Sequence, residues 1–364
     1  MTILAASRPA AASQIANVMI CDDSLVIRGA IARILESDPA VRVVAKVGNG
    51  RAAIEELRRT AVDVLVLDIE MPVLDGMSAL PLLLRAEPTL RVIMASTLTT
   101  RGADIALRAL RLGAADYVPK PSAVGGLGDD GFKRELLEKV KGLARMRRRT
   151  AQPAPSGSVV NAPPLRAAPL LPPRLLAIGS STGGPQALFT LVQALGRSIT
   201  VPVVLTQHMP ATFTPILAEH LTKLGGLRCL EAEDGETLVA GRIYLAPGDH
   251  HLHIDAAGTA LRARLSSDPP ENFCRPSVDP MLRSAAVACG GRVLVAMLTG
   301  MGHDGLAGTK AVISAGGGAI AQDETTSVVW GMPGAVAQAG LCHAVLPLPR
   351  IAPKLLEMLR MART

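Results

Sequence analysis

The stretch LLAIGSSTGG at residues 175–184 decides how the second half of this chain folds. Its four leading apolar residues predict a buried strand, and the glycines after them predict a sharp turn into a helix. A turn of the G-x-S-x-G kind lifts one hydroxyl out of the backbone as a nucleophile. The frame from Gly179 to Gly183 centres on Ser181 and so favours it over Ser180. The alternatives for Ser181 are a helix-capping hydroxyl or part of a phosphate cradle, although no lysine follows the glycines as in a Walker A site.

Apolar runs and helical patterns alternate on both sides of this stretch. Before it, the predicted strands are residues 18–21, 41–44, 62–67, 91–95 and 117–118. From the stretch onward, they are residues 175–178, 202–206, 242–246, 252–254, 261–265 and 293–298. Strands of this kind, separated by helices, build βαβ units. We therefore expect the α/β class, with a doubly wound, flavodoxin-like sheet followed by a second doubly wound, mostly parallel sheet.

The length and composition indicate two domains. A chain of 364 residues exceeds one ordinary core, and a proline-rich segment at residues 151–173 separates the two strand patterns. The expected division is a disordered leader at residues 1–16, a first domain at 17–140, a helix end and linker at 141–173, and a second domain at 174–364.

Cysteine usage and hydropathy predict a cytoplasmic protein that does not insert into the membrane. The five cysteines are scattered and odd in number, which is typical of reduced thiols. No apolar run approaches the roughly 20 residues that span a bilayer. The net charge of +7 includes an arginine-rich run at residues 145–149, for which the alternatives are a solvated helix end, contact with an acidic partner or contact with nucleic acid.

Five polar residues follow successive strands of the first predicted sheet. Asp22 and Asp23 follow the first strand, Asp68 ends the third, Ser96 follows the fourth and Lys120 follows the fifth. The carboxyl ends of parallel strands share one edge, so these residues should crowd together. Three carboxylates repel each other unless a hard dication lies among them, which predicts a Mg²⁺ site able to support phosphoryl transfer to a carboxylate. The alternative is a set of scattered surface acids and helix caps.

The segment Asp68-Ile69-Glu70-Met71-Pro72, followed later by Lys120-Pro121, resembles the response-regulator receiver family. The resemblance implies that Asp68 is the phosphoacceptor. It also implies that the Mg²⁺ ligands are Asp22, Asp23, Asp68 and the backbone carbonyl of Glu70. Ser96 and Lys120 would form the switch pair, and Tyr117 would be the switch aromatic.

The second half offers partners for a nucleophilic serine, which needs a base, an orienting acid and oxyanion donors. His208 and Asp304 each follow an apolar strand, so both are expected at the same sheet edge as Ser181. Their chain order, Ser then His then Asp, differs from that of the α/β-hydrolases. Taken singly, His208 could be a core histidine and Asp304 a turn residue, and the neighbouring His303 is a rival for the acid-base role.

The chain from about residue 17 to residue 359 resembles the chemotaxis protein-glutamate methylesterase (CheB) family. The resemblance rests on the receiver, the linker, GSSTGG (179–184), QHMP (207–210), RPSVD (275–279) and LTGMG (298–302). It implies Ser181 as nucleophile, His208 as general base and acid, Asp304 as its orienting acid, Met301 N–H as an oxyanion donor and Thr182 as a hydroxyl that steadies the histidine. Family members hydrolyse γ-methyl glutamate esters on the cytoplasmic domains of chemoreceptors, release methanol, and in many cases deamidate receptor glutamines.

The resemblance also implies partners and regulation. A histidine kinase would be the phosphodonor in chemotactic adaptation, Mg²⁺ would bind the receiver only, and the catalytic domain would need no cofactor. We expect a monomer that binds no DNA, with the unphosphorylated receiver covering the catalytic face. The rival is a non-enzymatic response regulator, although no helix-turn-helix pattern follows the linker.

Two features depart from the family or lie outside it. His303 stands where asparagine is common in the family, and the linker is long and rich in proline. His250, His251 and His253 have a spacing that could bind zinc, but positions in a hairpin are the favoured interpretation.

Overall fold

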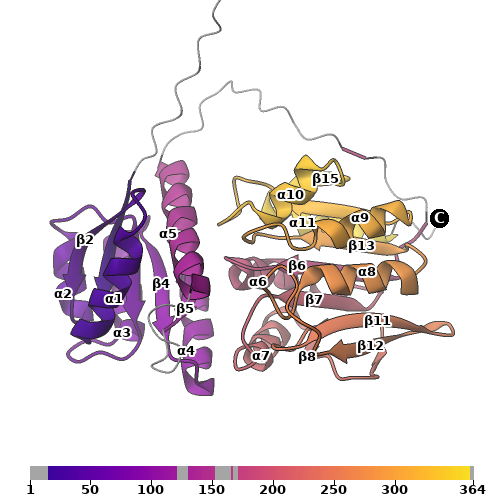
Figure 1. Ribbon diagram of the computed structural model, residues 1–364, viewed down its shortest axis with the longest axis horizontal. Helices are drawn as coiled ribbons and strands as arrows, with labels where there is room; N and C mark the ends of the chain where they lie inside the picture. The colour runs from indigo at the N-terminus through magenta and orange to yellow at the C-terminus, as the bar shows by residue number, and fades with distance from the viewer. Residues whose placement is uncertain (1–14, 121–129, 152–164, 167–170, 361–364) are drawn as a thin grey trace, which may run out of the picture.

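Each half of the chain is built around its own parallel sheet, and helices cover both faces of each sheet (Figure 1). The computed structural model describes residues 15–120, 130–151, 165–166 and 171–360. Residues 1–14 of the expected leader and most of the linker lie outside the described residues, and Ala16, the last residue of that leader, already belongs to the first strand. The α/β class with two doubly wound domains, expected from the alternating pattern, is confirmed.

The sheet of the first half, which is the half expected to be a receiver and is called the receiver sheet below, has five parallel strands in the order β2-β1-β3-β4-β5. Its strands are β1 (Ala16–Cys21), β2 (Val41–Val47), β3 (Val64–Asp68), β4 (Arg91–Ser96) and β5 (Asp116–Pro119). Its helices are α1 (Leu25–Glu36), α2 (Gly50–Leu57), α3 (Gly76–Ala86), α4 (Thr100–Arg111) and α5 (Asp130–Ala151). The strand order changes direction between β1 and β3, so a ligand crevice is expected where these two strands end.

Helix α5 carries the receiver beyond residue 140, where the sequence places its end. Leu143 and Ala144 lie in the receiver core, and Arg147 Nη1 lies 2.7 Å from Asp63 Oδ1. Arg148 also pairs with Asp63. Part of the arginine-rich run therefore anchors α5 to the receiver.

The sheet of the second half, which carries the predicted serine and is called the catalytic sheet below, has seven parallel strands in the order β15-β14-β13-β6-β7-β10-β8. Its strands are β6 (Leu175–Ser180), β7 (Val203–Gln207), β8 (Arg228–Glu231), β10 (Arg242–Leu245), β13 (Val293–Met297), β14 (Gly318–Gln322) and β15 (Ala344–Leu346). Its helices are α6 (Gly184–Leu195), α7 (Thr214–Gly225), α8 (Val278–Ala288), α9 (Leu306–Ser314), α10 (Met332–Gln338) and α11 (Leu348–Arg360), with a short 3₁₀ turn, η1 (Gly196–Ser198). The central strands β13, β6 and β7 carry the predicted catalytic residues at their carboxyl ends.

Two of the predicted strands do not join this parallel sheet. Residues 252–254 and 261–265 lie in β11 (His251–Ala257) and β12 (Ala260–Ser266), which pair antiparallel with each other. The other edge of β12 pairs antiparallel with β9 (Thr237–Leu238). Only Gly258 and Thr259 separate β11 from β12, and Gly258 has a φ of 61°. So short a turn joins antiparallel strands only, because a parallel partner needs a long crossover.

The two domains meet through α4, β5 and α5 of the receiver (Figure 1). The ring of Tyr117 stacks on Phe213 of the catalytic domain, with 4.6 Å between ring centroids. The amide of Gln186 donates to the Ala114 carbonyl at 2.7 Å and to that of Leu110. A single apolar cluster runs through residues of both domains, so the contact is continuous with their cores.

Candidate active site and phosphorylation site

The turn after β6 isolates one of the two serines. The hydroxyl of Ser180 is fully buried and donates to Gln207 Oε1 at 2.7 Å. Ser181 is half-buried, and within the described residues its hydroxyl has no hydrogen-bond partner. Gly183 has a φ of 72°, and a Cβ there would lie 2.3 Å from Val328. Glycine is therefore required at this position, where the chain turns into α6 and leaves the Ser181 hydroxyl without a hydrogen-bond partner among the described residues.

His208 and Asp304 meet beside this turn. His208 directly follows β7, and its backbone N–H donates to the Ser180 carbonyl at 3.2 Å. Its Nε2–H donates to Asp304 Oδ2 at 2.7 Å. The lone pair of a neutral ring then lies on Nδ1, which is the nitrogen left to accept a proton.

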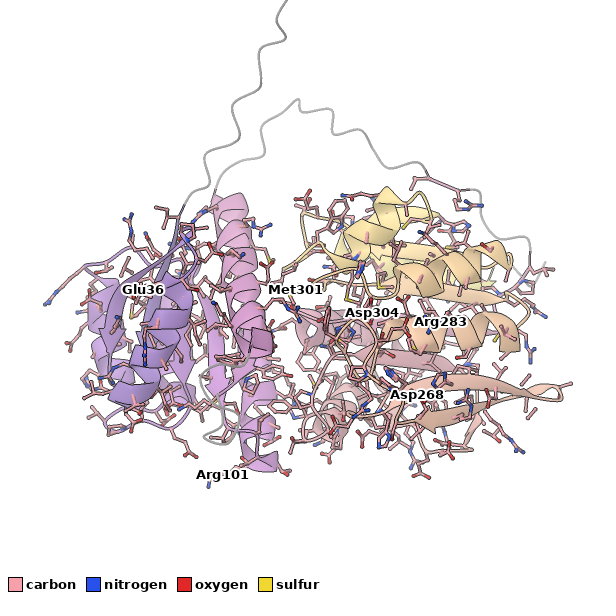
Figure 2. All side chains as sticks on the ribbon, viewed as in Figure 1. Glu36, Arg101, Asp268, Arg283, Met301 and Asp304 are labelled. Carbon is pink, nitrogen blue, oxygen red and sulfur yellow. The ribbon has the colours of Figure 1, made fainter. Side chains whose placement is uncertain are left out.

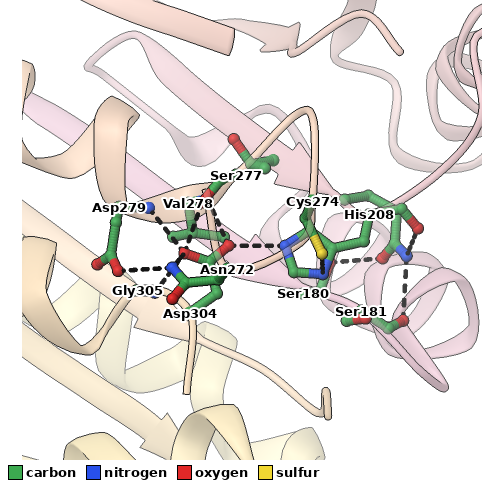
Figure 3. Close-up of polar contacts among 12 residues, drawn as sticks. Ser180, Ser181, His208, Asn272, Cys274, Ser277, Val278, Asp279, Asp304 and Gly305 are labelled. Atoms are coloured by element: carbon green, nitrogen blue, oxygen red, sulfur yellow. Dashed lines mark hydrogen bonds and ion pairs between the residues drawn. The ribbon is translucent and has the colours of Figure 1, made fainter. Parts of the chain in front are cut away.

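The Asp304 carboxylate is the centre of a network of donors (Figure 3). It is 2% exposed. Besides His208, its donors are the Ser277 hydroxyl (2.7 Å), the Asn272 amide (2.9 Å) and the backbone N–H groups of Val278 (2.6 Å), Asp279 (3.1 Å) and Gly305 (2.8 Å). So many donors fix the position of the carboxylate and keep it ionised.

This pairing shifts the titration of both partners. Burial by itself raises the pKa of Asp304, but the hydrogen bond and charge of His208 and the donors around it hold that pKa well below its ordinary value. Burial by itself lowers the pKa of His208. Hydrogen bonds to Asp304 and Cys274 outweigh burial and raise the pKa of His208 to about 10. The pairing with the ionised Asp304 therefore favours a proton on the His208 ring.

The backbone after β13 approaches the serine closely. A Cβ on Gly300 would lie 2.9 Å from Ser181 Cβ, so only glycine fits there. The next residue is Met301, and among the described residues no acceptor takes its backbone N–H. Met301 lies on the side of the catalytic domain that faces the receiver (Figure 2). An N–H group of this kind is available to an oxyanion on a substrate at Ser181.

Two neighbouring residues make no hydrogen bond with His208 among the described residues. The structure gives no hydrogen bond between Thr182 and His208, both of which it describes. Thr182 is buried, and its carbonyl accepts from the Thr299 hydroxyl at 2.9 Å. The side chain of His303 is exposed, whereas Asp304 is buried behind it, so His303 is no rival for the ion pair with His208.

Several polar residues of the site were missed in the sequence, because nothing in the pattern assigns them a role. Asn272 and Cys274 lie in a turn after the β11–β12 hairpin, far along the chain from the serine. Asn272 has a φ of 53°, a conformation that asparagine tolerates, and this is the one weak signal that could have indicated it. Ser277 and Asp279 belong to the quoted RPSVD segment, but no chemical role follows from that segment alone.

The three histidines at residues 250–253 make hydrogen bonds within this part of the fold. His251 is buried, accepts the Ser277 N–H on Nδ1 at 3.2 Å, and has its Nε2 3.2 Å from the Pro269 carbonyl. His253 Nε2 lies 2.9 Å from the Ser266 hydroxyl across the hairpin. Within the described ranges, the one acidic, cysteine and histidine cluster with metal-ligand spacing lies in the receiver.

That cluster is Asp22, Asp23 and Asp68, each of which offers an oxygen within 4.8 Å of the others. Asp22 and Asp68 are buried, and Asp23 is exposed. Lys120 Nζ lies 2.9 Å from Asp22 Oδ2 and 2.6 Å from Asp68 Oδ1. Burial raises the pKa of Asp68, and Lys120 acts against that rise. A set of carboxylate oxygens with one water-exposed member fits Mg²⁺, which prefers oxygen ligands and retains water.

Ser96 and Tyr117, the two other residues of the expected switch, lie on β4 and β5, between Asp68 on β3 and the domain interface. Ser96 is buried at the end of β4, and its hydroxyl donates to the Thr97 carbonyl at 3.2 Å. Tyr117 is buried on β5 against Phe213. Glu70 lies two residues after Asp68, and its side chain is exposed.

The receiver also contacts the nucleophile turn directly. Asp116 Oδ2 accepts the Gly183 N–H at 3.0 Å. Asp116 is fully buried, its Oδ1 lies 3.5 Å from Lys139 Nζ, and Lys139 pairs with Glu135 at 2.7 Å. A receiver carboxylate is thus bound two residues from Ser181, at the N-terminus of α6, where a helix favours negative charge.

Comparison with known proteins decides the family. The sequence profile of the family described as CheB methylesterase matches residues 176–355, and that of the response regulator receiver domain matches residues 18–129. A protein-glutamate methylesterase/protein-glutamine glutaminase of group 2 operon from Rhodospirillum centenum is 55% identical over 95% of each chain. The chain belongs to the CheB methylesterase family. The resemblance drawn from its motifs is thereby confirmed.

Other CheB relatives agree with this assignment. A protein-glutamate methylesterase/protein-glutamine glutaminase from Azospirillum brasilense is 54% identical and aligns with 93% of this chain and 91% of its own. The catalytic domain of the CheB methylesterase from Thermotoga maritima is 40% identical, with a TM-score of 0.50, over 51% of this chain and 98% of that domain. Within the described part of the chain, no helix is both long and apolar enough to cross a membrane.

Proposed function

We propose that this protein hydrolyses γ-methyl esters of glutamate on the cytoplasmic domains of chemoreceptors and deamidates receptor glutamines at the same site. The observation that carries the proposal is the His208–Asp304 pair beside the turn that carries Ser181, whose hydroxyl has no hydrogen-bond partner among the described residues. The names of its relatives, protein-glutamate methylesterase/protein-glutamine glutaminase, supply the substrate class. We further propose that it acts in the cytoplasm as a monomer in chemotactic adaptation.

The chemistry follows from the direction of each contact. Ser181 Oγ attacks the ester carbonyl while its proton passes to His208 Nδ1, because Nε2–H remains on Asp304. The negative oxygen of the tetrahedral intermediate accepts the Met301 N–H. The C–O bond to the methoxy group then breaks, and the proton on Nδ1 leaves with methanol. Water cleaves the acyl-enzyme by the same route, with His208 again acting as base and then as acid.

Regulation is proposed to run through the receiver. Receiver phosphorylation in general depends on Mg²⁺, which neutralises charge on the phosphoryl group during transfer. We assign its ligands to Asp22, Asp23, Asp68 and the Glu70 carbonyl, and the phosphodonor to a histidine kinase. The phosphoryl group on Asp68 would draw Lys120 and the Ser96 hydroxyl toward itself and repack Tyr117. That movement would loosen the contacts of Tyr117 and Asp116 with the catalytic domain and expose Ser181.

The test is methanol release from a methylated receptor peptide by the full chain, with peptide mass followed in parallel. We expect loss of one methyl group for each modified glutamate, stimulation by a small phosphodonor with Mg²⁺, and no measurable turnover for Ser181→Ala. Ser180→Ala is the matched control, because that neighbouring hydroxyl is committed to Gln207. Demethylation by Ser181→Ala at the parental rate would overturn the assignment of the nucleophile.

A further inference from the structure

The nitrogen of His208 that must accept the serine proton lies beside a thiol. Nε2 is committed to Asp304 at 2.7 Å, and Nδ1 lies 3.4 Å from Cys274 Sγ. Among the described residues, the Ser181 hydroxyl has no such contact with the ring. In this structure the base nitrogen therefore has a sulfur partner in place of the expected serine.

The direction of the Nδ1 contact follows from the tautomer. With Nε2–H donated to Asp304, a neutral ring carries its lone pair on Nδ1, and the Cys274 S–H donates to it. The thiol proton can also move onto Nδ1 to give a thiolate beside an imidazolium, the arrangement that activates cysteine in Cys–His pairs. In either form the lone pair of Nδ1 is occupied and cannot accept the proton of Ser181.

We propose that Cys274 is a positioning residue of the esterase: its thiol occupies the base nitrogen of His208 in the resting enzyme and must withdraw before Ser181 can attack. This inference rests on the proposed roles of Ser181 and His208. It adds a second restraint on the resting enzyme: Cys274 occupies the base nitrogen of His208, while the receiver is proposed to cover Ser181.

The turn that carries Cys274 has a strained backbone and contacts the receiver, so it can change conformation when the receiver withdraws. Glu271 and Cys274 pair across the turn, and its two central residues have positive φ values, 53° for Asn272 and 63° for Phe273. A bulky aromatic residue rarely adopts this conformation, so the turn holds strain that a different arrangement would relieve. The ring of Phe273 is 83% exposed, and Arg134 of receiver helix α5 lies over it, 5.0 Å from its centroid. Withdrawal of the receiver thus removes a contact from the same turn that places the sulfur.

Cys274 also differs from the other cysteines. It is partly exposed, whereas Cys21, Cys229, Cys289 and Cys342 are buried. Burial raises the pKa of Cys21 and Cys342 to about 12 and that of Cys289 to about 11, and it raises the pKa of Cys229 well above its ordinary value. Thiolates are the reactive form of cysteine, so these four thiols should be inert toward an alkylating reagent at neutral pH.

The first experiment measures the basal activity of the unphosphorylated full chain as a function of pH for the parent and Cys274→Ala. His208 acts only when deprotonated, and the sulfur favours its protonated form. Removal of the sulfur should therefore move the acidic limb of the pH–rate profile down by about one pH unit and raise basal activity near pH 7 by about tenfold. Cys289→Ala, which removes a buried thiol, should leave the profile unchanged. A Cys274→Ala profile that coincides with the parent overturns the proposal.

The second experiment needs no change at Cys274. Iodoacetamide forms an S–C bond with displacement of iodide, and the thiol proton passes through His208 to solvent. We expect one alkylated cysteine at pH 7, mapped to Cys274 by peptide mass spectrometry, and at least tenfold slower alkylation in His208→Gln, because the ring no longer accepts the thiol proton. Equal alkylation rates in the parent and His208→Gln would contradict the Cys274–His208 contact. The two proposals fail separately, because Ser181→Ala tests the nucleophile and the alkylation rate tests the thiol.

Discussion

The acidic site of the receiver and the serine site of the catalytic domain lie at equivalent edges of two parallel sheets, and each buries an aspartate. Asp68 is balanced mainly by one flexible cation, Lys120 at 2.6 Å. Asp304 is balanced by His208 and by donors fixed in the backbone and in two short side chains. A single lysine can be redirected when a phosphoryl group arrives, whereas several fixed donors cannot. The ion pair at Asp68 can therefore rearrange, whereas the hydrogen bonds around Asp304 hold the carboxylate in one position.

The largest expected effect is that of Asp304→Asn in the catalytic site, where the donors are fixed. An amide in place of the carboxylate no longer requires a proton on Nε2, so the ring can place its proton on Nδ1 and lose its base function. We expect kcat for methyl ester hydrolysis to fall by about 10⁴-fold. Methanol release measures kcat, and a thermal melt checks that the variant is folded. A kcat within tenfold of the parent would exclude Asp304 as the orienting acid.

The matching change at the switchable site is Asp68→Asn. It removes the proposed phosphoacceptor and leaves the serine site intact, so basal turnover should persist. The stimulation by a phosphodonor should be lost, and we expect that stimulation to be on the order of 5- to 150-fold in the parent. Asp23→Asn is a useful companion, because it weakens the proposed Mg²⁺ site without touching Asp68. Retained stimulation in Asp68→Asn would place the phosphorylation elsewhere.

Asn272→Ala tests whether the fixed donors of Asp304 act one by one. It removes one donor at 2.9 Å and leaves the others in place. A hydrogen bond to a charged group contributes about 1.5–3 kcal/mol, so kcat should fall by roughly tenfold to a hundredfold. Steady-state rates at saturating peptide measure the effect. Asn272→Asp is unsuitable as a conservative control because it adds a second negative charge, so Asn272→Gln serves that purpose.

Asp116→Ala loosens the contact between the two regions. The charged acceptor of the Gly183 N–H disappears, and the closed arrangement loses a hydrogen bond of about 1.5 kcal/mol. Basal hydrolysis without phosphodonor should rise by on the order of tenfold, while the fully stimulated rate stays close to that of the parent. Asp116→Asn retains a side-chain acceptor and should show a smaller rise. An unchanged basal rate in Asp116→Ala would show that this contact does not restrain the enzyme.

The last test of the fixed site is the pH dependence of stability in His208→Gln. The pKa of His208 is raised from 6.5 to about 10, so its contribution to folding is fully present below pH 6.5 and is lost as the pH rises through about 10. The stability deficit of the variant should therefore be largest near pH 6 and shrink toward pH 10 in urea unfolding. His220→Gln is the control with opposite sign. Burial lowers the pKa of His220, so its loss should favour folding, and only as the pH falls below 6.5.

The parts of the molecule that follow strand ends could be predicted from the sequence. Asp22, Asp68 and Lys120 follow three strands of one sheet, and Ser181, His208 and Asp304 follow three strands of another, so parallel pairing alone brings each set together. The fold class follows for the same reason, because continuous apolar strands that alternate with helices permit few other arrangements.

The features that were not predicted come from turns and from contacts across the domain interface. Asn272 and Cys274 reach the site through a turn after an antiparallel hairpin, and no strand periodicity sets the position of that turn. The role implied for the Thr182 hydroxyl stays a prediction, because the contact that the structure gives for Thr182 is made by its backbone carbonyl, which accepts from Thr299. Asp116 precedes the switch aromatic as an ordinary strand residue, and its contact with Gly183 exists only when the two domains pack together.

The stack of Tyr117 on Phe213 makes communication between the domains work in both directions. Under the proposed regulation, a receptor segment that binds at Ser181 would displace the receiver and would free the ring of Tyr117. Thermodynamic linkage then requires that whatever phosphorylation does for receptor binding, receptor binding does equally for the phosphorylated form of the receiver. A bound methylated receptor would thus stabilise the phosphorylated form of the enzyme. Phosphorylated enzyme would accumulate where its substrate is present.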